Sequence, residues 1–435
     1  MEKELMARTV KLLQELIQTD TTNELGNEIE AANVLISFFQ EYNIESQIIF
    51  SPGGRANLVA KLENNNKSEP IVLLSHLDVV GPGDGKWEYP PFSGVIENET
   101  IWGRGTLDTK QLTAMHAAIM VGLKKSQSSN SLNRTIIFIA TADEENGSQE
   151  GMEFLSKEYP EYFEQSTVFS EGGGFIVNDG GKKYMFYASG EKGTARVRLK
   201  STGEGGHAGA PPTDQALLLL VSGLTSLLQK TFNPLPYPIL NYFSETFKRT
   251  LNIEEFVEED EIFISQMHDY MRYPTVTIEN VKVGHQINVV PYYAEATIEI
   301  RTLPFQSRED VEKILEYLFR KNQVDWEIIS FQQGYESDIT NEALEQLEES
   351  CRKQDFSIKL IPFTALGKTD GRFISQMATN IYGISPVKIS FTEVLKRVHN
   401  TNERIELDSF EWGTSVLFDT ITFVARKEVH KNDYI

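Results

Sequence analysis

Cysteine is almost absent from this chain, since Cys351 is the single example among 435 residues. One cysteine cannot form an internal disulfide, and Cys351 falls in a predicted helix over residues 341–354, where we expect an inert packing thiol. Long apolar runs are missing too. The sequence contains no stretch of about eighteen consecutive apolar residues, so no membrane-spanning helix is predicted. The first residues also lack the apolar core of a secretory signal.

Positive charge is in short supply. The chain has 41 lysines and arginines against 63 aspartates and glutamates, a formal net charge of -22 at pH 7. Nucleic acids and anionic membrane surfaces attract basic proteins, so neither is expected as a partner. Together with the missing signal and the cysteine content, this predicts a cytoplasmic protein.

The length of the chain and its order of elements predict an α/β protein of two domains. A single core rarely grows to this size. Apolar runs at residues 71–74 and 135–140 are typical of buried strands, and residues 112–123 between them have helical spacing. Strand, helix and strand in this order indicate a crossover between parallel strands. We assign residues 1–189 to this first domain, which residues 335–435 resume.

Residues 190–334 have a different pattern and predict an inserted second domain. The expected order is strand, helix, strand, strand, helix and strand, which matches a ferredoxin-like α+β unit. Within it, residues 233–272 are rich in aromatic and acidic side chains with weak periodicity, so we expect a long excursion there. The predicted elements are residues 194–201, 215–228, 275–281, 294–301, 308–320 and 325–331.

A histidine and an aspartate follow the first buried strand directly. His76 can offer one ring nitrogen to a metal, while Asp78 is placed to accept the proton of the other nitrogen and so to fix the tautomer. A single histidine and aspartate of this kind are weak evidence for a metal site, because structural histidines are common. Other acids and a second histidine at comparable places strengthen this evidence.

Further ligand candidates lie where other strands end. Asp108 stands among glycines before a helix, and it could cap that helix or hold two cations through its two oxygens. Glu144 and Glu145 end a strand, and in an extended segment they would point to opposite sides, one toward a metal and one toward the substrate as a proton carrier. Glu171 follows another apolar run, and His399 lies in a polar loop. Nitrogen and oxygen ligands without thiolate suit two Zn²⁺ ions, with Co²⁺ or Mn²⁺ as substitutes.

These motifs, in this order, resemble peptidase family M20, the aminoacylase, carboxypeptidase and dipeptidase superfamily of di-zinc hydrolases. The resemblance covers nearly the whole chain and implies a zinc-peptidase-like catalytic domain with a mixed central sheet flanked by helices, plus a lid and dimerisation domain. The motifs that carry it are Ser75-His76-Leu77-Asp78, Gly103-Arg104-Gly105 before Asp108, Glu144-Glu145, Glu171-Gly172-Gly173, and His399 with Asn402-Glu403.

Carried over residue by residue, the resemblance implies two metal sites that share one aspartate. His76, Asp108 and Glu171 would hold one ion, and Asp108, Glu145 and His399 the other. Glu144 would be the general base for attack on an amide carbonyl by a water that bridges the metals. A cis peptide bond at Asp108-Thr109 is also implied, although many relatives carry Asp or Met where this chain has Thr109.

The resemblance further implies substrate-binding residues and a homodimer. His207 matches a lid histidine that in relatives reaches the active site, often that of the partner subunit; the alternative is a turn histidine beside flexible glycines. Asn288 would bind the substrate carboxylate or the oxyanion, and Arg372 would hold a carboxylate with two hydrogen bonds.

The predicted function is therefore metal-dependent hydrolysis of an amide bond in small peptides, as a carboxypeptidase or dipeptidase, or in N-acyl amino acids. The segment of residues 87–94 resembles the branch that contains Gly-Xaa carboxypeptidases and N-acyl amino acid hydrolases. The alternative is a catalytically silent small-molecule binding protein that kept the fold. It is disfavoured because every predicted ligand and the predicted base are present.

Overall fold

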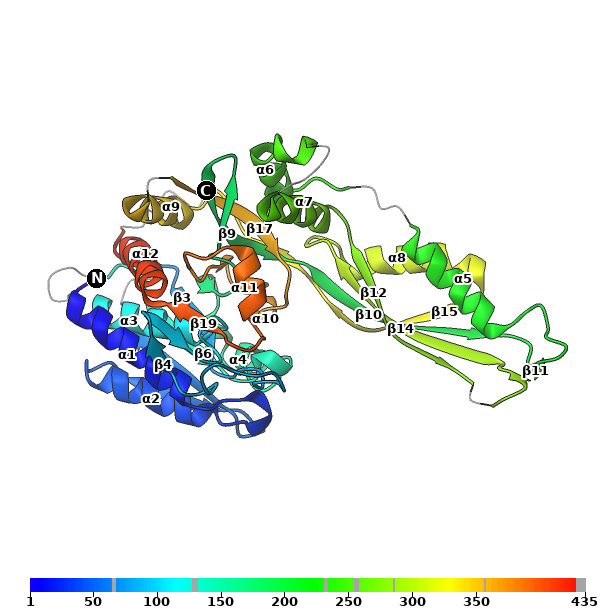
Figure 1. Ribbon diagram of the computed structural model, residues 1–435, viewed down its shortest axis with the longest axis horizontal. Coiled ribbons are helices and arrows are strands. Elements are labelled where there is room, and N and C mark those ends of the chain that lie inside the picture. The colour runs from blue at the N-terminus through cyan, green and yellow to red at the C-terminus, as the bar shows by residue number, and fades with distance from the viewer. Residues whose placement is uncertain are drawn as a thin grey trace. The chain divides into compact units, whose positions relative to one another are not determined.

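The computed structural model describes residues 1–64, 68–126, 132–230, 234–253, 258–284, 286–355 and 357–427. The chain folds into two compact units (Figure 1). The first comprises Met1–Ser189, Ile253–Ile262 and Ser337–Ile435, and the second comprises Gly190–Asn252 and Phe263–Glu336.

A mixed sheet forms the centre of the first unit. Its middle strands β6, β3, β7 and β18 run parallel to one another, while β1 and β2 are antiparallel to their neighbours. β8 and β17 pair with β9 at the other side. In order across the sheet the strands are β1 (Ser46–Phe50), β2 (Ala56–Leu62), β6 (Ile136–Thr141), β3 (Ile71–His76), β7 (Thr167–Ser170), β18 (Asn380–Gly383) and β9 (Lys182–Glu191), with β8 (Ile176–Asp179) and β17 (Ile358–Ala365) beside β9.

Helices flank this sheet, as Figure 1 shows. α2 packs on β1 and β2, α3 packs on β3 and β6, and α9 packs on β17, while α1 and α12 pack on α3. Among the described residues, no helix has both the length and the apolar character that crossing a bilayer requires. The helices are α1 (Lys3–Gln18), α2 (Glu28–Gln40), α3 (Lys110–Ser126), α4 (Met152–Glu158), α9 (Glu342–Gln354), α10 (Gly371–Ile374), α11 (Phe391–Arg397) and α12 (Leu407–Arg426).

The predicted α/β class with a mixed central sheet is confirmed. The apolar run of β3 is fully buried, and α3 lies between β3 and its parallel neighbour β6 along the chain, as the crossover pattern indicated. Cys351 is buried in α9, and this burial raises the pKa of its thiol, as expected of a packing residue.

A small antiparallel sheet of β19 (Arg404–Glu406), β5 (Thr100–Trp102) and β4 (Val95–Glu97) lies beside the ligand-bearing loops.

The second unit has the predicted ferredoxin-like order. Its antiparallel strands are arranged β12-β14-β10-β15, and α5 packs against β10, β14 and α8. Apolar residues that alternate along β10 and β14 fill the core between sheet and helices. The elements are β10 (Gly193–Thr202), β11 (Gly206–His207), α5 (Ala216–Leu228), β12 (Thr275–Val283), β13 (Val289–Val290), β14 (Tyr293–Thr302), α8 (Arg308–Phe319), β15 (Asp325–Gln332) and β16 (Tyr335–Glu336).

Where the structure describes residues 233–272, they form the long excursion that the sequence predicted, inserted between α5 and β12. It contains the helices α6 (Pro238–Thr246) and α7 (Glu259–Arg272), while residues 233 and 254–257 lie outside the described residues. In α7 the buried positions Phe263, Ile264, Met267 and Met271 recur at helical spacing. Acidic and aromatic residues between them obscured this stripe in the sequence.

Short 3-10 turns are η1 (Asn23–Leu25), η2 (Glu144–Asn146), η3 (Pro160–Tyr162), η4 (Thr250–Asn252) and η5 (Arg320–Asn322).

Candidate metal centre

The predicted ligands meet at the carboxyl ends of the parallel strands in the first unit, where open α/β sheets usually bind their ligands. His76 is the last residue of β3, Glu171 directly follows β7, and Glu145 lies in η2 after β6. Asp108 lies in the loop between β5 and α3, and His399 lies in the turn after α11.

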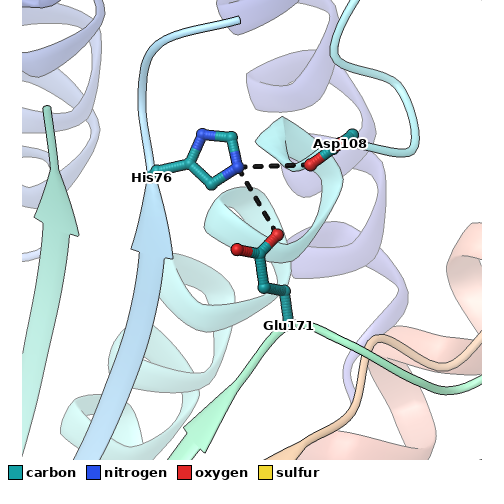
Figure 2. Close-up of side chains that lie close together, drawn as sticks. All are labelled: His76, Asp108 and Glu171. Atoms are coloured by element: carbon teal, nitrogen blue, oxygen red, sulfur yellow. Dashed lines mark hydrogen bonds and ion pairs between the residues drawn. The ribbon is translucent and has the colours of Figure 1, made fainter. Parts of the chain in front are cut away.

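Two triads of ligand atoms form there, and Asp108 belongs to both. His76 Nε2 lies 3.2 Å from Asp108 Oδ1 and 3.4 Å from Glu171 Oε2 (Figure 2). His399 Nε2 lies 2.9 Å from Asp108 Oδ2 and 3.3 Å from Glu145 Oε2. Within each triad the ligand atoms lie within 4.8 Å of one another. The two oxygens of one carboxylate thus face two different groups of ligands.

The donor set fits divalent cations. Each triad offers one imidazole nitrogen and carboxylate oxygens, the ligands that zinc, cobalt and manganese accept. Oε1 of Glu145 is buried and has no hydrogen-bond partner among the described residues. A buried carboxylate oxygen is normally satisfied, so this atom has an unused capacity that a cation would fill.

The electrostatics of the site indicate an excess of negative charge. Burial by itself lowers the pKa of His76, yet Glu171 and Asp108 outweigh it and raise that pKa well above its ordinary value. Hydrogen bonds to Asp108 and Glu145 raise the pKa of His399 to about 10. Burial and the neighbouring carboxylates raise the pKa of Glu144 well above its usual range. Such crowding of acids calls for positive charge between them.

The expected role of the Asp78 carboxylate toward His76 is wrong in its detail. The ring Nδ1 of His76 lies 2.9 Å from the main-chain oxygen of Asp78, which accepts its proton. The Asp78 carboxylate is 3.6 Å from that nitrogen, longer than a hydrogen bond. It instead accepts the backbone N–H groups of Glu144 and Glu145, each at 3.1 Å. Asp78 therefore directs Nε2 of His76 toward the site through its backbone and holds the glutamate turn through its side chain.

Glu144 and Glu145 lie in a turn and not in the extended segment that we expected. Asp143 has a left-handed φ of 64°, and η2 begins directly after it. β6 therefore ends at Thr141, before the two glutamates. The cis peptide bond that the resemblance implied is present at Asp108-Thr109.

A pocket of about 560 Å³ opens onto both triads. Glu144, Glu145, Arg372 and His399 line it together with apolar side chains. Arg372, in α10, donates from Nη1 to the main-chain oxygen of Thr369 at 2.7 Å. The apolar lining consists of Leu107, Phe175, Phe363, Ala365, Leu366, Val387, Phe391, Val394, Leu395 and Val398.

His207 and Asn288 belong to the second unit. His207 ends β11, which pairs with β13, and the backbone N–H of Ala208 donates to the main-chain oxygen of Asn288 at 3.0 Å. Asn288 has a left-handed φ of 61°. The two residues are thus neighbours on one exposed ladder, and their roles toward a substrate stay predictions.

Asp370 is a buried acid near the site to which the sequence reasoning gave no role. Its carboxylate accepts hydrogen bonds from Thr141 Oγ1 at 2.7 Å and Ser148 Oγ at 2.6 Å. It therefore ties the end of β6 and the turn after it to α10, which carries Arg372. Its position directly before Gly371 and Arg372 was a sequence signal for a role near the site. Its hydroxyl partners could not be predicted, because they lie more than 200 residues away in the chain.

Fold and site together are those of a hydrolase with a candidate two-ion metal centre. The chain belongs to the peptidase family M20/M25/M40, whose model matches residues 72–422.

Relatives and solved structures support this assignment. The human N-fatty-acyl-amino acid synthase/hydrolase PM20D1 is 27% identical over 81% of this chain and 74% of its own length. A probable succinyl-diaminopimelate desuccinylase of Staphylococcus aureus is 25% identical over 83% of this chain and 84% of its own. The crystal structure of the M20 metallo-carboxypeptidase Sso-CP2 from Sulfolobus solfataricus has the same fold, with a TM-score of 0.70, 19% identity, and coverage of 97% of this chain and 99% of that one.

Proposed function

We propose that this hydrolase cleaves an amide bond in small peptides or N-acyl amino acids, using two Zn²⁺ ions for which Co²⁺ or Mn²⁺ can substitute. The observation that carries the proposal is the Asp108 carboxylate, whose two oxygens face His76 and His399 at 3.2 and 2.9 Å. A carboxylate that bridges two cations is typical of co-catalytic pairs, and no neutral side chain can replace it.

In the proposed mechanism the bound cations supply Lewis acidity, which lowers the pKa of water and polarises the substrate carbonyl. Glu144 lines the pocket beside the triads and takes the proton of the attacking water. Glu144 then gives the proton to the leaving amine.

The pocket lining supports a substrate with an anionic and an apolar part. Arg372 offers a guanidinium that can bind a carboxylate, while Phe391 and Leu395 of α11 line the pocket with apolar surface. PM20D1 is named for N-fatty-acyl amino acids and Sso-CP2 for carboxypeptidase activity. Both substrate types join a free carboxylate to an amide. We further propose a homodimer in which His207 and Asn288 of the second unit contact the substrate.

A substrate panel tests the proposal. Purified protein loaded with zinc is expected to release free amino acids from a set of dipeptides and N-acyl amino acids, and a chelator is expected to stop the reaction until zinc is restored. Product is measured by chromatography. A protein that binds small molecules of this type without turning any over supports the catalytically silent alternative and contradicts the proposal.

Arg372→Met is expected to weaken catalysis selectively. A hydrogen bond to a charged group contributes about 1.5–3 kcal/mol, so kcat/KM should fall roughly 10- to 100-fold for substrates with a free carboxylate. The same substrates with a carboxamide in its place should be cleaved slowly and at equal rates by both proteins. An equal loss for both substrate types would show that Arg372 does not recognise the anion.

A further inference from the structure

Glu403 is a fully buried acid whose carboxylate holds the loop that carries Asp108. Its Oε1 accepts the backbone N–H groups of Gly105 at 3.1 Å, Leu107 at 2.8 Å and Asp108 at 3.3 Å. Its Oε2 accepts a hydrogen bond from Arg104 Nη1 at 2.6 Å. Neither side chain of this ion pair is more than 1% exposed. One carboxylate therefore accepts hydrogen bonds from three backbone N–H groups and one arginine side chain of the same loop.

The same residue connects this loop to the turn that carries His399. Glu403 follows His399 by four positions, and its main-chain oxygen accepts the N–H of Gly103 at 2.9 Å. Directly after it, Arg404 in β19 pairs with Trp102 in β5. The backbone pairing of β5 with β19 is thus directly adjacent to the hydrogen bonds that the Glu403 side chain makes with the Asp108 loop.

The loop has little freedom to adopt another path. Gly103 and Gly105 have φ values of 153° and 89°. A side chain at Gly103 would meet Ile17 Cγ2 at 2.3 Å and the main-chain oxygen of Pro91 at 2.9 Å. Close packing on the protein itself therefore requires glycine at position 103. The positive φ of both glycines further restricts these positions, because residues with a side chain rarely adopt it.

We propose that Glu403 is a positioning residue that sets the distance between Asp108 and His399 and thereby shapes the second metal triad. This inference rests on the proposed metal centre. The ligand distance at stake is the 2.9 Å between His399 Nε2 and Asp108 Oδ2. Glu403 is absent from the described residues that line the pocket, so it acts through the backbone of Asp108 and not on the substrate.

Its contacts predict a difference between two substitutions. Glu403→Ala removes the acceptor of three N–H groups and leaves the buried Arg104 without its anion. Glu403→Gln keeps one oxygen that can accept the same N–H groups. Loss of a residue that orients a metal ligand typically costs roughly 10- to 100-fold in metal affinity. We expect a loss in this range for one of two zinc ions in Glu403→Ala and a smaller loss in Glu403→Gln.

The test measures zinc binding by competition with a chromophoric chelator, beside the melting temperature of the zinc-free protein. Glu411→Gln, the same charge change at an exposed position of α12, is the control and should bind zinc like the wild type. Excess zinc should restore turnover in Glu403→Ala. If Glu403→Ala does not fold, zinc binding is measured in two other variants. These are Glu403→Gln and the double variant Arg104→Met/Glu403→Gln, which removes both buried charges.

The possible results separate this inference from the proposed function. Variants that bind both zinc ions with wild-type affinity, while only their melting temperature falls, show a purely structural role and overturn the inference alone. A wild-type protein that binds no zinc overturns the metal centre and this inference with it. A selective loss of affinity for one of the two zinc ions in the Glu403 variants supports both.

Discussion

Glu144→Gln is expected to abolish most turnover while the protein keeps its metal. Proton transfer by a positioned side chain typically contributes about 10²- to 10⁴-fold to a rate, and the amide of glutamine can neither take nor deliver that proton. Glu144 belongs to neither ligand triad, so metal binding does not depend on it. The measurements are kcat with the best substrate of the panel and metal content by elemental analysis.

Glu150→Gln is the matched control for this substitution. Glu150 lies in the segment that follows the same turn, and its carboxylate accepts the backbone N–H of Gly53 at 2.8 Å, away from the pocket. Its turnover should stay near that of the wild type. Full activity in Glu144→Gln would rule out Glu144 as the proton carrier, and loss of metal from it would place Glu144 among the ligands.

Asp108→Ala is expected to lose both metal and turnover. This carboxylate is the member common to the two triads, at 3.2 Å from His76 and 2.9 Å from His399. Its removal would deprive both proposed ions of a ligand and would leave Glu145, Glu171 and Glu144 crowded together. The loss of affinity should therefore exceed the roughly 10- to 100-fold that follows from removing an orienting partner.

The comparison of Asp108→Ala with the Glu144 variant separates metal binding from proton transfer. Asp325→Ala, at an exposed aspartate that begins β15, controls for the loss of one negative charge. Zinc stoichiometry by elemental analysis and melting temperature with and without zinc are the measurements. A folded Asp108→Ala protein that still holds two ions would contradict the shared-ligand arrangement.

The fold was predictable where the sequence has a strong period. The buried run of β3 and the helical spacing of α3 led directly to the crossover, and alternation in β10 and β14 led to the ferredoxin-like unit. Strands of three residues such as β4, β5 and β19 are too short to show a period. Their pairing depends on backbone hydrogen bonds between distant segments, which side-chain patterns do not reveal.

The sequence was enough to predict which residues form the candidate site and after which strands they lie, but not their hydrogen-bond partners. His76 and Glu171 could be predicted as candidate ligands because acids and imidazoles follow buried strands whose ends meet, whereas the choice of Glu145 over Glu144 was implied by the family resemblance alone. The real acceptor for His76 Nδ1 is a main-chain oxygen, which every residue has and which therefore leaves no signal in the sequence. Likewise, Asp143 adopts a left-handed φ that no pattern around it indicated.

The two triads differ in their access to water. The side chain of His76 is 1% exposed, whereas that of His399 is 50% exposed. An ion held with His399 would meet competing ligands from the solvent directly, while its neighbour would be shielded by β3 and the loops above it. Depletion of metal would then proceed in two unequal stages, with a half-loaded protein as a long-lived species between them.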